Sequence, residues 1–125
     1  KDIPALSDAR LNLYNAAWSR LPAPQGLKAI AYGEELEVCG VRLQVIPTPG
    51  HTPGGICLYA KDEGVLFSGD TLFCAGYGRV DFPGSSAADM RASLLKLFAL
   101  PGETRVLPGH GEETTIARER ARYQL

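Results

Sequence analysis

Hydrophobic and polar positions alternate along residues 36–46, and this alternation predicts two short β-strands. Val41, Leu43 and Val45 are apolar, and the residues between them are polar. Because successive side chains of a strand point to opposite faces, we expect one face to be buried and the other to meet water. The dipeptide Cys39-Gly40 separates the two strands, which favours a hairpin with a tight turn.

Three further segments have the apolar character of strands. Residues 56–59 and 65–67 are joined by a polar stretch, and residues 104–107 form a short strand later in the chain. Val65-Leu66-Phe67 is continuously apolar, which is typical of a strand that is covered on both faces.

The clearest helix is predicted over residues 85–100. Ser85 or Ser86 can cap its start, and Pro101-Gly102 ends it. Its apolar side chains recur on one face, which we expect to join the core. They are Met90, Leu94, Leu97 and Phe98.

The segments before and after this helix differ from it in composition. Residues 70–84 are rich in glycine and proline, which predicts a long loop of the kind that carries function. Residues 112–122 predict a charged helix in which arginines alternate with Glu119 and Ala121. This alternation indicates a solvated helix face rather than a basic stripe for nucleic acid.

The composition is that of a folded domain. The 125 residues are 45% hydrophobic and 22% charged, and a net charge of −1 gives no field for nucleic acid or an anionic membrane. No apolar run approaches the ~20 residues of a membrane span. Three cysteines without a Cys-x-x-Cys motif argue against a disulfide framework and for a reducing, cytoplasmic location. We expect Cys39 in a turn, Cys57 in the core and Cys74 in the loop, none of them catalytic.

Three apolar strands each run into a Gly- or Pro-rich loop that presents one histidine or aspartate. These residues are His51, Asp70 and His110, and the chain has no other histidine. Strand ends are a rigid base for ligands, and two imidazoles with one carboxylate suit Zn²⁺ or Fe²⁺ better than Ca²⁺ or Mg²⁺. Taken singly, each residue has another interpretation. A histidine in a Pro-Gly turn is usually a surface residue, and Asp70 can form an Asx-turn.

Three strings resemble the later metal motifs of the metallo-β-lactamase fold, and most closely those of its glyoxalase II-like thioester hydrolases. They are Thr48-Pro49-Gly50-His51-Thr52-Pro53-Gly54, Phe67-Ser68-Gly69-Asp70-Thr71-Leu72-Phe73 and Leu107-Pro108-Gly109-His110-Gly111. The resemblance runs over residues 36–120. Residues 78–84, Gly-Arg-Val-Asp-Phe-Pro-Gly, are similar to a segment of small glyoxalase II-like proteins and of persulfide dioxygenases.

The resemblance implies an α/β fold, namely the C-terminal half of an αβ/βα sandwich with a mixed sheet and flanking helices. Residues 1–125 would form a partial domain. Residues 1–35 would be a connecting segment with short helical turns, and residues 36–125 the C-terminal β/α half. The family's first metal motif, His-x-His-x-Asp-His, does not occur in these 125 residues. We therefore expect the chain to be a truncated part of a longer parent.

The resemblance also implies a two-metal centre with seven ligands. His51 would complete a three-histidine set on the first metal, Asp70 would bridge the metals and orient the attacking hydroxide, and His110 would ligate the second metal. The metals would be two zinc ions in the full-length parent, with iron or manganese as other choices. We expect Arg79 and Asp81 to form an ion pair that fixes the long loop.

The implied function is metal-dependent hydrolysis of a small-molecule thioester such as a hydroxyacylglutathione. The chain alone is expected to be inactive, because the absent motif supplies four of the seven ligands in that family. One alternative is an iron-dependent persulfide dioxygenase of the same fold. Another is a non-catalytic fragment that associates, for instance as a homodimer, through the sheet face that the other half of the sandwich would cover.

Overall fold

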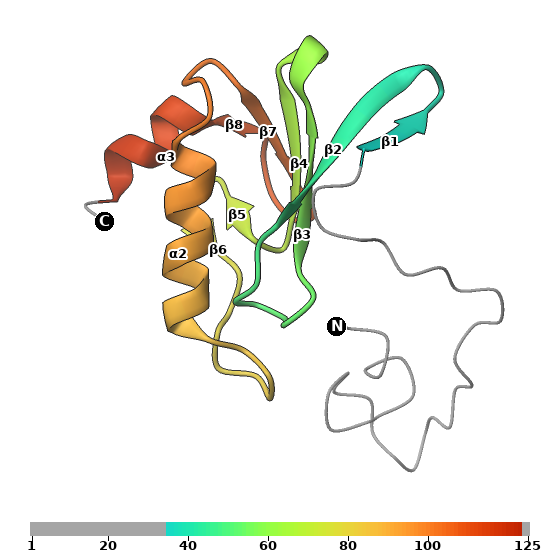
Figure 1. Ribbon diagram of the computed structural model, residues 1–125. Helices are drawn as coiled ribbons and strands as arrows, with labels where there is room; N and C mark the ends of the chain where they lie inside the picture. Colours follow the sequence, from blue (N-terminus) through green and yellow to red (C-terminus); the bar gives the residue numbers. More distant parts are fainter. Residues whose placement is uncertain (1–34, 124–125) are drawn as a thin grey trace, which may run out of the picture.

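Six strands form the main sheet of the computed structural model, which describes residues 35–123 (Figure 1). Their order across the sheet is β1-β2-β3-β4-β7-β8. The strands are β1 (Glu35–Val38), β2 (Val41–Pro47), β3 (Ile56–Ala60), β4 (Val65–Gly69), β7 (Arg105–Pro108) and β8 (Thr114–Thr115). The connecting segment expected over residues 1–35 lies outside the described residues, except for Glu35.

The remaining elements are a small second sheet and the helices. Strands β5 (Leu72–Phe73) and β6 (Gly76–Tyr77) pair as a hairpin, and a 3₁₀ turn, η2 (Lys61–Glu63), follows β3. Helix α2 (Ala87–Phe98) precedes β7, and helix α3 (Ile116–Arg122) follows β8. Within residues 35–123 no helix combines the length and apolarity needed to cross a membrane.

The predicted hairpin is confirmed. Val38 pairs with Val41, and the two turn residues, Cys39 and Gly40, have φ angles of 51° and 79°. Two positive φ angles are typical of a two-residue hairpin turn whose twist matches that of its strands. The alternation in β2 also holds, since Leu43 and Val45 are buried and the polar residues Arg42 and Gln44 are exposed.

The sheet is mixed, as expected, and its strand directions matter for the site. Strands β1 to β4 pair antiparallel in sequence order, whereas β4 and β7 pair in parallel. Strands β2, β4 and β7 therefore run in the same direction, and their carboxyl ends meet at one edge of the sheet.

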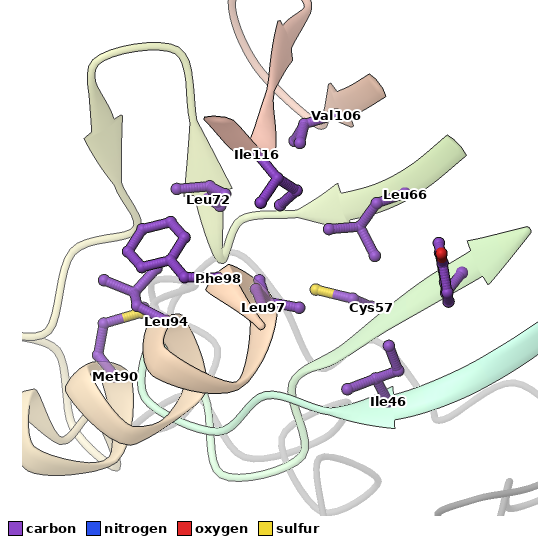
Figure 2. Packing of buried hydrophobic residues seen from close by; sticks show 11 residues of the cluster. Ile46, Cys57, Leu66, Leu72, Met90, Leu94, Leu97, Phe98, Val106 and Ile116 are labelled. Carbon is purple, nitrogen blue, oxygen red and sulfur yellow. The ribbon is translucent and has the colours of Figure 1, made fainter. Parts of the chain in front are cut away.

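Helix α2 begins where the sequence predicts it. Ser86 is its N-cap, and the Ser86 Oγ accepts a hydrogen bond from Asp89 N at 3.1 Å. The four apolar residues predicted for its inner face are all buried. Figure 2 shows them packed with side chains of the sheet and of α3, and Figure 1 shows both helices on the same side of the sheet. The sheet residues of this core are Ile46, Cys57, Tyr59, Leu66 and Val106.

The expectation that residues 65–67 are covered on both faces is wrong. Leu66 is fully buried, but Phe67 is 42% exposed. The helices pack on the Leu66 face of the sheet, and Phe67 points to the opposite face because side chains alternate along a strand.

The prediction of one long loop over residues 70–84 is also wrong in part, because the segment contains the β5–β6 hairpin. Leu72 in β5 is fully buried in the main core. The buried Leu72 side chain packs in the core and so fixes the start of this segment.

Glu119 is fully buried, which contradicts the prediction of a solvated helix face around it. It lies three residues after the buried Ile116, and side chains three apart share one face of an α-helix. That spacing was the sequence signal that could have placed Glu119 on the inner face. The neighbouring Arg118 and Arg120 are exposed, as expected.

Candidate metal centre

The three predicted ligands lie together at one edge of the sheet. His51 follows β2, Asp70 follows β4 and His110 follows β7, so the shared strand direction brings all three to the same edge. Asp70 lies between the two histidines. Its Oδ2 is 3.7 Å from His51 Nε2, and its Oδ1 is 2.7 Å from His110 Nδ1.

The loop before His51 is bound to helix α2 through its backbone carbonyls. Donors on the helix and in the two residues before it reach four backbone carbonyls between residues 47 and 51. They are Lys96 Nζ to Pro47 O (2.6 Å), Ser93 Oγ to Pro49 O (2.7 Å), Ser86 N to Gly50 O (2.8 Å) and Ser85 Oγ to His51 O (2.7 Å). These bonds satisfy carbonyls that would otherwise need water and fix the backbone that carries the histidine.

Gly50 allows the loop to approach the helix this closely. A Cβ at this position would lie 2.6 Å from Met90 Cα, which is closer than any real contact of that kind. The φ angle of Gly50 is +147°, a conformation that side chains with a Cβ rarely adopt. The glycine in the Pro-Gly-His string is therefore required by packing as well as by backbone geometry.

The His51 ring is oriented by the segment that follows β6. Its Nδ1 donates a hydrogen bond to the Arg79 carbonyl oxygen at 2.7 Å, and the ring of Phe82 packs edge-on at 5.8 Å between centroids. Donation from Nδ1 leaves the Nε2 lone pair available on the side that faces Asp70. The side chain of His51 is 23% exposed.

The predicted ion pair of Arg79 and Asp81 is confirmed. Arg79 Nη2 lies 2.7 Å from Asp81 Oδ2, and the guanidinium stacks 4.4 Å above the ring of Phe82. The hydrogen bonds that Arg79 donates lower the pKa of Asp81 below its ordinary value. Both side chains are about two-thirds exposed, so this pair adds little to global stability and acts locally on the loop.

His110 is held by the strand beside it. The Gly109 N–H donates to Gly69 O at 2.8 Å, which aligns the two loops that carry Asp70 and His110. A Cβ at Gly109 would lie 3.1 Å from Asp70 Oδ1, so the glycine gives the carboxylate room. The side chain of His110 is 75% exposed, and the ring of Phe73 meets it edge-on at 6.0 Å.

Buried hydroxyl groups join the loops beneath the site. Thr48 Oγ1 lies 3.1 Å from Thr71 Oγ1, so the His51 and Asp70 loops are linked below their ligands. Cys57 Sγ lies 3.4 Å from Thr48 Oγ1, and burial raises the pKa of this thiol, which keeps it neutral in the core as predicted. The sequence motifs contained Thr48 and Thr71, but nothing in their spacing indicated that the two hydroxyls meet.

The donor types at this edge fit a transition metal, because imidazole nitrogen and carboxylate oxygen are ligands of zinc and iron. Their arrangement does not by itself form a metal cage. His110 bonds Asp70 directly, and residues 35–123 contain no group of three or more His, Cys, Asp or Glu side chains placed to hold an ion. The metal-binding roles of His51, Asp70 and His110 stay predictions.

Known proteins share both the sequence and the fold. Hydroxyacylglutathione hydrolase of Xanthomonas euvesicatoria pv. vesicatoria is 45% identical over 107 residues, which are 86% of this chain and 39% of that protein. The structure of BLEG-1 B3 metallo-beta-lactamase matches with a TM-score of 0.79 at 34% identity, over 96% of this chain and 59% of that one. The structure of TTHA1623 in a di-iron-bound form matches with a TM-score of 0.78 at 37% identity, over 95% of this chain and 58% of that one.

The chain spans less than half the length of the curated relatives it matches. Residues 13–110, which make up most of the chain, match the family model for the metallo-beta-lactamase superfamily. The mixed sheet with its flanking helices has the architecture of the matched structures. The chain belongs to the metallo-beta-lactamase superfamily.

Proposed function

We propose that this chain provides part of the active site of a metal-dependent hydrolase that acts on glutathione thioesters of the hydroxyacylglutathione type. The observation that carries the proposal is the convergence of His51, Asp70 and His110 at one sheet edge, in motifs that resemble those of that class. The 45% identity to a hydroxyacylglutathione hydrolase supports the substrate class. Cys39, Cys57 and Cys74 of this chain are free thiols, which supports a cytoplasmic location as part of the proposal.

The residues would divide the work as follows. His51 would present Nε2 to one zinc ion, His110 would bind a second, and Asp70 would reach both and orient the attacking water. Zinc, when bound, lowers the pKa of water and polarises a carbonyl group. The chain's own contribution is positional: the Arg79 carbonyl fixes the His51 ring, and Gly109 leaves space for the Asp70 carboxylate.

Three protein donors shared by two ions are fewer than a stable two-zinc site uses. The 125 residues contain no further histidine. We therefore propose that the remaining ligands come from polypeptide outside these residues, and that this chain alone binds zinc weakly and does not turn over substrate.

Two measurements test this proposal: a zinc titration measured by calorimetry, and a thioesterase assay on S-lactoylglutathione. The wild-type chain should bind zinc weakly and release it to a chelator, and Asp70→Ala should abolish binding. Asp62→Ala, which removes an exposed aspartate from η2, is the matched control and should bind like wild type. A chain extended through its upstream coding sequence should hydrolyse the thioester. Hydrolysis by the 125-residue chain that survives Asp70→Ala would refute the site assignment.

A second candidate is an iron-dependent persulfide dioxygenase, and the structure of ETHE1 from Myxococcus xanthus, a persulfide dioxygenase that matches this chain at 38% identity with a TM-score of 0.68, favours it. The same residues would then hold iron. Metal analysis of the extended protein, with oxygen consumption measured on glutathione persulfide, separates the two candidates. Iron content with oxygen uptake and no thioesterase activity would favour the dioxygenase.

A third candidate is association through the open sheet face. Leu58, Phe67 and Leu107 are paired in register across β3, β4 and β7 and point away from the helices. Phe67 is exposed and the two leucines are partly buried. We propose that a second copy of the chain packs on Phe67 about a two-fold axis, because that axis places the same apolar patch on both sides of the interface. Light scattering should give a dimer that Phe67→Asp dissociates, whereas Leu95→Asp, an equally exposed apolar site on α2, should not. A monomeric wild-type chain would refute this.

A further inference from the structure

Glu119 has no exposed surface, although it lies in a helix rich in charged residues. Its Oε1 accepts a hydrogen bond from the backbone N–H of Ala75 at 2.8 Å, and its Oε2 accepts one from Thr114 Oγ1 at 2.5 Å. Arg122 Nε lies 3.2 Å from Oε1. A buried carboxylate is costly unless its oxygens are bonded in this way, so its partners in the β5–β6 turn, β8 and α3 fix its position.

The turn that Glu119 holds is strained. Phe73 pairs with Gly76 across the β5–β6 hairpin, and Ala75 in the turn has a φ angle of +62°. Residues with a Cβ disfavour this left-handed conformation, which glycine adopts readily. The hydrogen bond from Ala75 N to the buried carboxylate gives this turn a fixed anchor 44 residues away in the sequence.

The hairpin that this turn closes, together with the two residues that follow it, contacts each of the three candidate ligands. It begins directly after the Asp70 loop, and its Phe73 ring meets the His110 ring. At its other end Gly78 N donates to Thr71 O at 3.2 Å, and a Cβ at Gly78 would lie 1.8 Å from Asp70 O. The next residue supplies the carbonyl that orients His51. A rotation of the hairpin would therefore disturb the contact of the His110 ring, the packing against the Asp70 backbone and, through Arg79, the hydrogen bond of the His51 ring.

We propose that Glu119 is a positioning residue of the metal centre: its buried carboxylate anchors the β5–β6 hairpin in the orientation that sets His110 and the Asp70 loop. The proposal rests on the proposed function for the identity of the site. The anchor itself belongs to the chain's own geometry and is present without metal. No step of the reaction passes through Glu119, which acts through Ala75 and Phe73.

The test uses NMR on the metal-free 125-residue chain. The readouts are the His110 ring correlations, the Gly78 amide and hydrogen exchange at Ala75. Glu119→Ala should shift the His110 ring correlations and the Gly78 amide signal. It should also speed hydrogen exchange at the Ala75 amide by about tenfold or more. Glu119→Gln should restore the wild-type pattern, because its amide oxygen accepts from Ala75 N and its NH₂ donates to Thr114. If Glu119→Ala fails to fold, Glu119→Asp, whose shorter side chain withdraws from Ala75, should give the same shifts.

Two controls separate positioning from simple stabilisation. Thr114→Val removes one partner of the carboxylate but keeps the hydrogen bond from Ala75 N, so it should lower global stability and move the His110 signals less than Glu119→Ala does. Glu113→Ala removes an exposed carboxylate that pairs with Arg105, and it should change neither the global stability nor the His110 signals. Unchanged His110 and Gly78 signals in Glu119→Ala, or equal shifts in Thr114→Val, would overturn the proposal. Zinc titration of the wild-type chain is read separately, so a failure of zinc to bind would refute the proposed function alone.

Discussion

The loop that carries His51 is bound to helix α2 at several backbone carbonyls, and its histidine side chain is 23% exposed. The loop that carries His110 is aligned by the Gly109 bond to Gly69, and its histidine side chain is 75% exposed. One ring is oriented by a backbone carbonyl and the other by the carboxylate of Asp70. The site thus combines a candidate ligand whose ring is oriented by the backbone with a candidate ligand whose ring is oriented by another side chain.

The largest effect is expected at the glycines of the two loops. Gly50→Ala should destabilise the chain by about 3 kcal/mol, because the new methyl group overlaps Met90 and the backbone conformation disfavours it. Gly111→Ala, at a φ of +81° with no atom near its Cβ, should cost only the local strain of about 1 kcal/mol. Urea unfolding of both variants measures the difference, and equal losses would break the comparison.

The serine that holds the His51 loop should matter next. Ser93 is buried, and Ser93→Ala leaves the Pro49 carbonyl without its side-chain donor, at a cost of about 1–2 kcal/mol. We expect the His51 ring signals to shift in an NMR spectrum and the His110 signals to stay. A spectrum in which both histidines move together would show that the two loops are not held independently.

Removal of the Asp70 carboxylate should have the opposite effect on the two histidines: the His110 signals should change and the His51 signals should stay. Asp70→Ala deletes the partner of His110 Nδ1, whereas His51 keeps its bond to the Arg79 carbonyl. Global stability should change by about 1 kcal/mol or less, because the pair is exposed. The His110 ring should lose its fixed orientation in ring-proton NMR, and Asp62→Ala should leave it unchanged. Loss of order at His51 instead would contradict the assignment of its support.

The smallest effect is the pH dependence of the Arg79–Asp81 ion pair, in the segment whose backbone carbonyl orients His51. Arg79 depresses the pKa of Asp81, so the ion pair is complete above the ordinary aspartate value and is lost as the pH falls through the lower, folded value. The Arg79 Nε resonance should therefore stay constant from neutral pH to about 4 and change only in more acidic solution. Asp81→Asn should abolish this step. A change centred near neutral pH would exclude Asp81 as its source.

Much of the fold followed from local pattern. The β1–β2 hairpin, helix α2 with its Ser86 cap and the three strand-to-ligand loops were all predicted, because alternation, capping and Gly/Pro punctuation act within a few residues. The candidate site residues were identified from their strand-end loops and from motifs that resemble those of a known family, and the Arg79–Asp81 pair was predicted from the same segment.

The errors came from long-range contacts. Continuous apolarity of residues 65–67 did not reveal which face the helices cover, and glycines concealed the β5–β6 hairpin. Glu119 looked like one charge among many because its partners, Ala75 and Thr114, come from other elements. The spacing from Ile116 could have placed it on the inner face, but only the fold shows which groups it bonds.

The parallel pairing of β4 with β7 has a consequence for the order of folding. Strands β1 to β4 pair with neighbours in sequence, whereas the hairpin and helix α2 separate β4 from β7 along the chain. Contacts that close longer stretches of chain form more slowly because they cost more entropy. Asp70 and His110, 40 residues apart, should therefore come together in the last step. Pulse-labelled hydrogen exchange should find β2 and β3 protected before β7, so that a partly folded chain holds most of its sheet and none of its site.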